Sequence, residues 1–171
     1  MDQSEQVYIK LQRHLDSQTM GFPATRSGSE RRVLRHIFTP REAEIATCLT
    51  HKFEPLDRVF ERARHLVESP KKLEELLDRI EQKGGIESKI KDGKKHYCNL
   101  PLIVGMFELQ LDKLTPEFLK EIHALIHNSN LPDEKKNKFA SEVRNLAVKK
   151  SQAFYSAEEI SDLFCAAISS L

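Results

Sequence analysis

Hydrophobic residues recur every three or four positions along most of this chain, which is the spacing of amphipathic helices. The pattern predicts a short helix over 7–15 and a second helix that runs from Ser29 to Phe38. Between them, the Gly, Pro and Ser residues of 21–28 predict an ordered loop. We therefore expect residues 1–38 to form N-terminal helices and a Gly/Pro loop that pack on the core that follows.

Three more helices are predicted between residues 39 and 83, and each has a recognisable start. Thr39 and Glu42 form a capping box with a proline in the first turn. Glu54-Pro55 opens the next helix, and Ser69-Pro70 supplies an N-cap and an N1 proline for the third. Gly84-Gly85 ends that third helix, because glycine tolerates the left-handed conformation of a C-terminal cap.

A β-hairpin is predicted directly after the third helix. Residues 86–90 and 96–100 flank Asp92-Gly93, a strong hairpin-turn signal. Three helices followed by a hairpin is the order of a winged helix-turn-helix, in which residues 70–83 would be the recognition helix and the hairpin the wing. The predicted fold class is mostly α with a small β-hairpin: a winged-helix domain over 39–114 and a helical C-terminal extension over 115–171.

The segment after the wing, 101–114, is apolar in its first half. It is predicted to be a helix rather than a buried strand because its apolar positions continue past strand length, although Gly105 weakens a helix. Thr115-Pro116 opens a helix that runs to about His127, and residues 132–145 are predicted to be helical. A capping box at 156–159 opens a last amphipathic helix, 156–171, which could pair two subunits as a homodimer.

The composition is that of a globular chain with many exposed helix faces: 31% of residues are charged and 39% are hydrophobic. The net charge is +1, without the basic excess of a dedicated nucleic-acid binder. No apolar run reaches the roughly 20 residues of a membrane span, and the first residues carry no secretory h-region. Three scattered cysteines indicate a reducing compartment. We expect a cytoplasmic protein without a membrane partner.

Two functional hypotheses divide on the charge of the recognition-position helix. A DNA-binding transcription regulator would use the basic residues of this helix and of the wing, which are Lys71, Lys72, Arg79, Lys89, Lys91, Lys94 and Lys95. Within the helix, carboxylates at 74, 75, 78 and 81 balance the cations and would oppose attraction to phosphate. The charge pattern therefore favours a non-catalytic interaction or regulatory module, with DNA binding as the alternative.

The surface expected to dock a protein partner consists of the 21–28 loop and the apolar segment after the wing. Its predicted residues are Phe22, Pro23, Arg26, Leu102 and Met106.

No catalytic pattern is present, so the chain is not expected to be an enzyme. It has no phosphate-binding glycine loop and no nucleophile with a matching base. His123 and His127 have the i, i+4 spacing that can share a metal, but no third ligand is apparent, and they are predicted to border an apolar helix face. Cys48, Cys98 and Cys165 are far apart and are predicted to be small buried residues. We expect no cofactor or metal in this chain.

Three segments together resemble a known family. They are Gly21–Thr25 with Ser27-Gly28 and Glu30, Ile37–Pro40 with Glu42–Ala46, and Pro101–Gln110. Over about 8–114 the chain resembles the N-terminal winged-helix region of ferredoxin-type iron–sulfur (4Fe-4S) proteins of anaerobic bacteria and archaea. In such proteins this region precedes a cysteine-rich part that binds the clusters, and no such part is present in these 171 residues.

The resemblance implies a redox or energy-metabolism setting. The implied partner is a ferredoxin-type redox protein, or the cluster-binding part that follows this region in the family. The resemblance assigns no iron–sulfur cluster ligand to any residue of this sequence.

Overall fold

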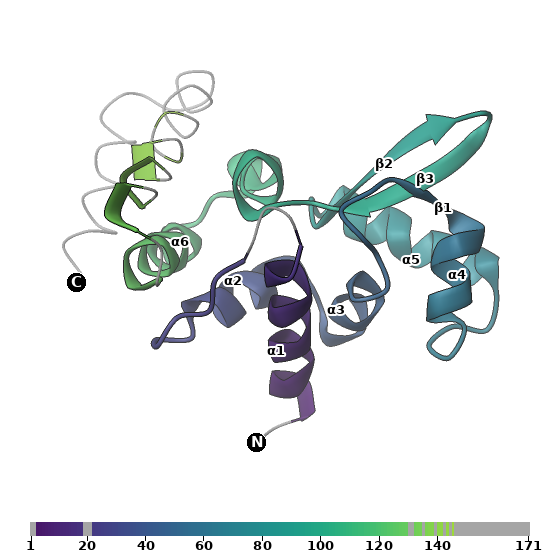
Figure 1. The fold of residues 1–171 in the computed structure, drawn as a ribbon, viewed down its shortest axis with the longest axis horizontal. Helices are drawn as coiled ribbons and strands as arrows, with labels where there is room; N and C mark the ends of the chain where they lie inside the picture. The colour runs from purple at the N-terminus through teal and green to yellow at the C-terminus, as the bar shows by residue number, and fades with distance from the viewer. Residues whose placement is uncertain are drawn as a thin grey trace.

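The computed structural model describes residues 3–18, 22–129, 132–134, 136–138, 140, 141, 143 and 145 (Figure 1). Within them the fold is mostly helical with one small antiparallel sheet, in agreement with the coarse prediction. The predicted tail helix over 156–171 lies outside the described residues. In chain order the elements are α1 (Gln3–Asp16), α2 (Ser29–Ile37), α3 (Pro40–Ala46), β1 (Glu54–Pro55), α4 (Leu56–Ala63), α5 (Pro70–Gln82), β2 (Ile86–Lys91), β3 (Lys94–Asn99), η1 (Leu102–Met106), η2 (Glu108–Lys113) and α6 (Pro116–Asn128).

The predicted hairpin is confirmed, and it is part of a three-stranded sheet of order β1-β3-β2. Its two-residue turn holds Asp92 at φ 52° and Gly93 at φ 71°. Two successive residues with positive φ are the geometry of a type I′ turn, which suits the twist of the strands. The added strand, β1, pairs Glu54 with Tyr97 of β3. The segment Glu54-Pro55 was predicted to open a helix, but it is extended, with Pro55 at ψ 153°, and α4 begins at Leu56.

The helix starts follow the predicted capping residues. Thr39 accepts a hydrogen bond from the Glu42 amide, and the Glu42 carboxylate accepts one from the Thr39 amide at 2.8 Å, so the capping box of α3 is complete. The Ser69 hydroxyl accepts a hydrogen bond from the Lys72 amide and caps α5, and the Thr115 hydroxyl accepts one from the Phe118 amide and caps α6; each cap is followed by proline at the first helical position. These caps are local in sequence, which is why the pattern alone located them.

The regular helix predicted over 101–114 is wrong. The chain instead makes a wide turn, η1, in which the Met106 amide donates to the Pro101 carbonyl, and a tight 3₁₀ segment, η2. Gly105 lies against the Pro101 ring, where an added Cβ would be 3.0 Å from the proline Cδ. The proline and the close approach at Gly105 favour this irregular backbone, which places Met106 and Phe107 in the core.

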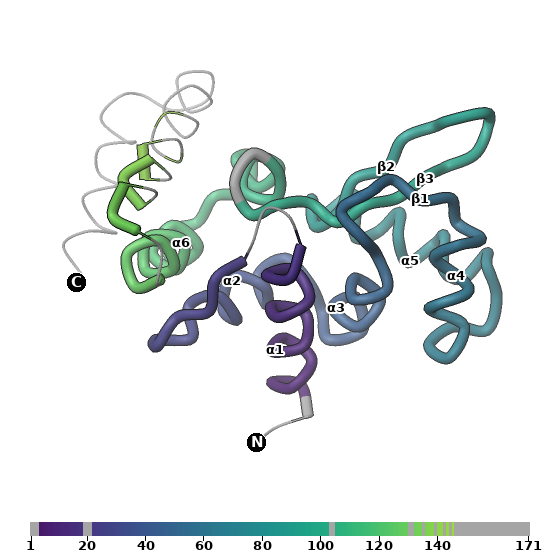
Figure 2. Tube along the Cα trace, viewed as in Figure 1, coloured from purple at the N-terminus to yellow at the C-terminus, as the bar shows by residue number. Residues whose placement is uncertain are grey.

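The elements share one hydrophobic core. Helix α1 packs against α2 and α3, α2 packs against α6, and α5 packs against α3, α4 and β2. Residues such as Leu11, Ile45, Leu77, Phe107 and Ile122 belong to the same buried cluster. In Figure 2 the path of the chain places α6 at one end of the long axis and the β2–β3 hairpin at the other.

Candidate nucleic-acid interface

Helix α5 carries its polar residues in two stripes. Its apolar residues Leu73, Leu77 and Ile80 are fully buried and fix the rotation of the helix. One polar stripe holds the carboxylates at 74, 78 and 81, which recur at helical spacing and are half-buried beside the sheet. The other stripe, at 71, 72, 75, 79 and 82, is exposed. The helix therefore turns different charges toward the sheet and toward solvent.

The sheet-facing stripe is held by hydrogen bonds. The Lys95 ammonium group donates to both oxygens of Asp78, at 2.9 and 2.8 Å, and the Tyr97 hydroxyl donates to the same carboxylate at 2.9 Å. The amide and hydroxyl of Ser88 donate to Glu81 Oε1 at 3.0 and 2.6 Å. Burial and then the hydrogen bond to Asp78 raise the pKa of Tyr97 above its usual value. Asp78 and Glu81 thus fasten the hairpin to α5.

The exposed stripe of α5 is mainly cationic. Lys71, Lys72 and Arg79 surround a single carboxylate, Glu75, to which Lys72 Nζ donates at 3.0 Å. The hydrogen bond from Lys72, and then the charges of Lys71 and Arg79 among others, lower the pKa of Glu75. Lys71 and Arg79 make no ion pair with another described residue. This face presents three positive charges and one negative charge to solvent.

The lysines of the β2–β3 hairpin have different surroundings. Lys91 and Lys94 flank the turn, are exposed, and form no ion pair within the described part of the chain. The Lys89 ammonium nitrogen lies 3.9 Å from the centroid of the Phe53 ring, a cation–π contact that leaves the side chain at the surface. Lys95 forms an ion pair with Asp78, so its charge is used to hold the hairpin on α5.

Buried polar side chains, which the sequence does not mark, hold the frame around α5. Asn99 Nδ2 donates to the carbonyls of Ala46 and Leu49, both at 3.1 Å. These two backbone acceptors at and just after the end of α3 therefore have a hydrogen-bond partner. Gln110 Nε2 donates to the Lys83 carbonyl at the end of α5. Lys83 Nζ in turn donates to the buried Glu42 at 2.7 Å. The donors and acceptors of these hydrogen bonds are 27 to 53 residues apart in the chain, so a local sequence pattern cannot predict them.

Three of the five residues predicted to form a docking surface are buried. Phe22 is 1% exposed and Met106 0%, and Leu102 is nearly as well covered. Phe22 is fixed by α1, because its amide donates to Asp16 and its carbonyl accepts from Gln12. Pro23 is half-buried and Arg26 is exposed. In this structure the predicted set does not form a continuous outer surface, because its apolar members fill the core.

The histidine pair and the described cysteines lie elsewhere. The rings of His123 and His127 have centroids 4.1 Å apart on α6, and the described residues contain no cluster of three potential metal ligands. Burial, and then the charge of His127, lower the pKa of His123. Cys48 and Cys98 are buried, as predicted, and burial raises the pKa of Cys98 to about 11, which disfavours the thiolate. Cys165 is outside the described residues.

Comparisons of this chain with protein-family models, with curated proteins and with solved structures find no match. The resemblance to the N-terminal region of ferredoxin-type proteins therefore remains a prediction from the sequence. Among the described residues, no helix is both long enough and apolar enough to cross a membrane. The functional argument rests on the arrangement of α5 and the hairpin.

Proposed function

We propose that residues 39–100 form a winged helix-turn-helix module that binds duplex DNA through the exposed stripe of α5 and the tip of the wing. The order α3, β1, α4, α5, β2, β3, with the sheet order β1-β3-β2, supports this interpretation. In a helix-turn-helix the second helix of the motif enters the major groove, and that position belongs to α5. The hairpin would then lie beside the groove and contact the backbone.

The observation that supports the proposal most is that the α5 carboxylates lie mainly on the side of the helix that faces the sheet, away from the exposed cations. Counted along the sequence, four carboxylates oppose phosphate binding by this helix. In the fold, Asp78 and Glu81 accept hydrogen bonds from the hairpin, and Glu74 lies on the same stripe. Only Glu75 remains among the exposed cations. The main objection to DNA binding in the sequence is thus weakened by the helix geometry.

The contacts expected from this surface are mostly to phosphate. Lys71, Arg79, Lys91 and Lys94 offer four unpaired positive charges in the described residues. Gln82 is the one side-chain amide on the exposed stripe that could read an adenine edge. Phosphate contacts position a protein on the duplex but do not read its sequence. We therefore expect salt-dependent binding with modest sequence preference.

Docking to a protein is the second candidate, and two exposed apolar side chains favour it. Ile90 on the wing is 76% exposed and Leu109 on η2 is 48% exposed. The partner would be a ferredoxin-type redox protein or a cluster-binding part of the kind that follows this region in the resembled family. Single exposed apolar residues are normal on protein surfaces, so these two support docking less strongly than the charge arrangement supports DNA binding.

The test is a fluorescence-anisotropy titration of a labelled duplex at low salt. We expect Lys71→Glu with Lys94→Glu to weaken binding strongly, because two phosphate contacts become repulsions. Lys10→Glu with Arg13→Glu is the matched control, since it changes the net charge by the same amount at two exposed residues of α1 outside the proposed surface. Equal losses in the double variant and the control would indicate non-specific attraction to net charge. Unchanged binding in the double variant would exclude this surface as the DNA interface.

A further inference from the structure

Helix α6 lies toward the end of the molecule opposite the β2–β3 hairpin (Figure 2), and its C-terminal residues line a second polar site. It is a pocket of about 530 Å³ between the 25–28 loop, the end of α6 and the helical residues near 136. Its lining residues are Arg26, Ser27, His127, Asn128, Ser129 and Lys136. None of them is acidic and three carry basic side chains, so the pocket has the composition of an anion site.

The backbone on two sides of the pocket is held in place. Thr25 and Ser129 form an antiparallel bridge, which ties the loop that carries Arg26 to the end of α6. The buried carboxylate of Glu30 accepts hydrogen bonds from the Thr25 amide at 3.1 Å and from its hydroxyl at 2.6 Å. The Ser129 hydroxyl donates to the Ile126 carbonyl at 2.8 Å. Arg26 and the 127–129 segment therefore have a fixed relative placement before any ligand binds.

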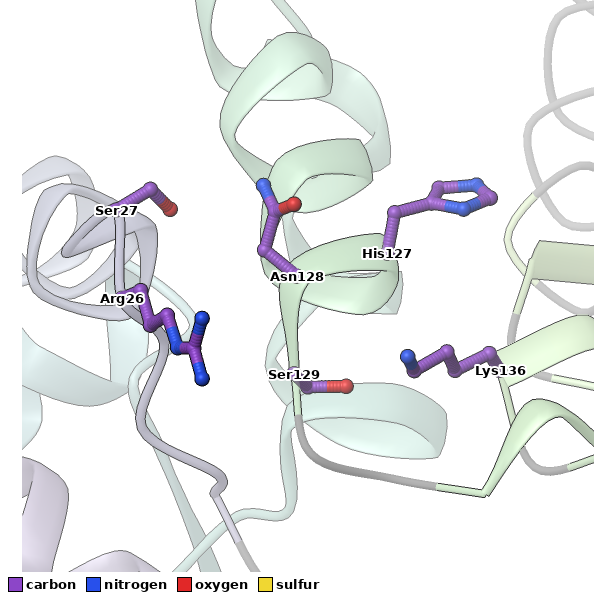
Figure 3. A pocket seen from close by; sticks show the side chains of 6 residues that line it. All are labelled: Arg26, Ser27, His127, Asn128, Ser129 and Lys136. Atoms are coloured by element: carbon purple, nitrogen blue, oxygen red, sulfur yellow. The ribbon is translucent and has the colours of Figure 1, made fainter.

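The positive charges of the pocket are only weakly offset by carboxylates in the described part of the chain. Arg26 makes no ion pair or hydrogen bond with another described residue. Lys136 has one carboxylate within reach, Asp133 at 3.8 Å, and that side chain is 94% exposed. Figure 3 shows Arg26 and Lys136 extending from opposite sides toward the Asn128–Ser129 segment. An arginine without an ion pair and a lysine with one long, exposed ion pair, both directed toward polar groups, are suited to a small, highly charged anion.

We propose that this pocket binds the phosphate group of a small molecule. The planar guanidinium of Arg26 can donate two parallel hydrogen bonds to phosphate oxygens, and Lys136 adds a point charge. Asn128 offers a neutral side-chain hydrogen-bond donor beside them. The carbonyl end of α6 opposes an anion here, so the site requires the basic side chains and prefers a doubly charged group to a monoanion. This inference is independent of the DNA-binding proposal.

The experiment is a titration of the ¹⁵N-labelled full chain with inorganic phosphate at constant ionic strength, set with sodium chloride. We expect saturable shifts of the Ser27, Asn128 and Ser129 amide resonances. Arg26→Ala and Lys136→Ala should each weaken binding by at least about tenfold, the loss expected for one charge-assisted contact. Arg58→Ala removes an exposed arginine of α4, outside both the pocket and the proposed DNA surface, and should leave phosphate binding unchanged.

Two results would overturn the inference. One is the absence of saturable shifts at these amides, or equal shifts in Arg26→Ala and the unmodified chain. The other is a stronger shift of the same amides with duplex DNA than with phosphate, which would reassign the pocket to nucleic acid. If no DNA binding is found at α5 while these amides still shift with phosphate, the phosphate-pocket inference is retained and the DNA-binding proposal is rejected.

Discussion

Lys95 of β3 donates to both carboxylate oxygens of Asp78 on α5, at 2.9 and 2.8 Å, across seventeen residues of sequence. The contact has two consequences. It fastens the hairpin to the helix, together with the Tyr97 hydroxyl that donates to the same carboxylate. It also removes one negative charge from the set that would face a bound polyanion. A single ion pair therefore links the stability of the fold to the charge of its exposed helix face.

The first prediction concerns the stability that Asp78 provides. Asp78→Ala should lower the free energy of unfolding by about 1–2 kcal/mol, because it leaves the buried Tyr97 hydroxyl and the Lys95 ammonium group without their acceptor. This loss of unfolding free energy is at the low end for a hydrogen bond to a charged group, because solvent screens the Asp78 side chain, which is 33% exposed. Urea unfolding measures the effect. Glu75→Ala, on the exposed stripe, should leave stability nearly unchanged, and equal losses in both variants would contradict the two-stripe arrangement.

The second prediction concerns DNA affinity and Glu75. Glu75→Gln should tighten binding of a duplex at low salt by roughly two- to fivefold, the range of one surface charge interaction. The reason is that Glu75 is the one carboxylate among the exposed cations of α5. Anisotropy titration measures the change. Glu117→Gln removes the same charge from exposed α6 and should have no effect; a weaker complex for Glu75→Gln would show that Glu75 helps to bind DNA.

The third prediction compares two glycines with similar backbone angles. Gly84 at φ +80° and Gly93 at φ +71° both lie in the left-handed region. A Cβ at Gly84 would lie 2.6 Å from Leu109 Cβ, whereas a Cβ at Gly93 would meet nothing within 4 Å. Gly93→Ala should therefore cost about 1–2 kcal/mol and Gly84→Ala about 2–4 kcal/mol, because only the latter adds a clash. Thermal unfolding of both variants checks the order, and similar losses would contradict it.

The fourth prediction concerns pH and Glu42. Burial by itself would raise the pKa of Glu42, but hydrogen bonds from Lys83 and Thr39 outweigh burial and lower it below the usual 4.5. Between the two pKa values the unfolded chain binds a proton that the folded chain does not, so the folded state loses stability as pH falls. The contribution of Glu42 is complete above about pH 4.5 and disappears as pH falls through its folded-state pKa.

Urea unfolding at pH 7 and at acidic pH measures this dependence. Glu42→Gln is the matched variant, because glutamine can still serve the capping box but does not titrate in this range. The unmodified chain should lose more stability on acidification than Glu42→Gln does. Parallel losses in the two proteins would show that Glu42 does not contribute to the acid sensitivity.

The features that the sequence predicts correctly depend on neighbours within a few residues. The Thr39–Glu42 capping box, the Ser69 cap and the Asp92-Gly93 turn are of this kind. The features it misses depend on distant partners. Strand β1 forms because Glu54 pairs with Tyr97, and Asn99 of β3 donates a hydrogen bond to the Ala46 carbonyl at the end of α3. The periodicity of hydrophobic residues along the chain predicts neither of these contacts.

The candidate site shows the same division. The spacing of positions 74, 78 and 81 on one helix side can be read from the sequence, but the partner of that side depends on how the hairpin folds back. The burial of three predicted docking residues, Phe22, Leu102 and Met106, is missed for a related reason. Phe22 and Met106 are apolar and lie in irregular segments, where no periodicity indicates which side chains turn inward, and both are buried.

The central claim is that α5 and the wing bind the phosphates of duplex DNA, and its most direct test is the salt dependence of that binding. With four phosphate contacts, from Lys71, Arg79, Lys91 and Lys94, a plot of log K against log salt concentration should have a slope of roughly −3 to −4. Lys94→Glu should reduce the magnitude of that slope by about 1. Absence of binding at the lowest salt, or a slope near zero, would contradict the claim and leave protein docking as the function of this module.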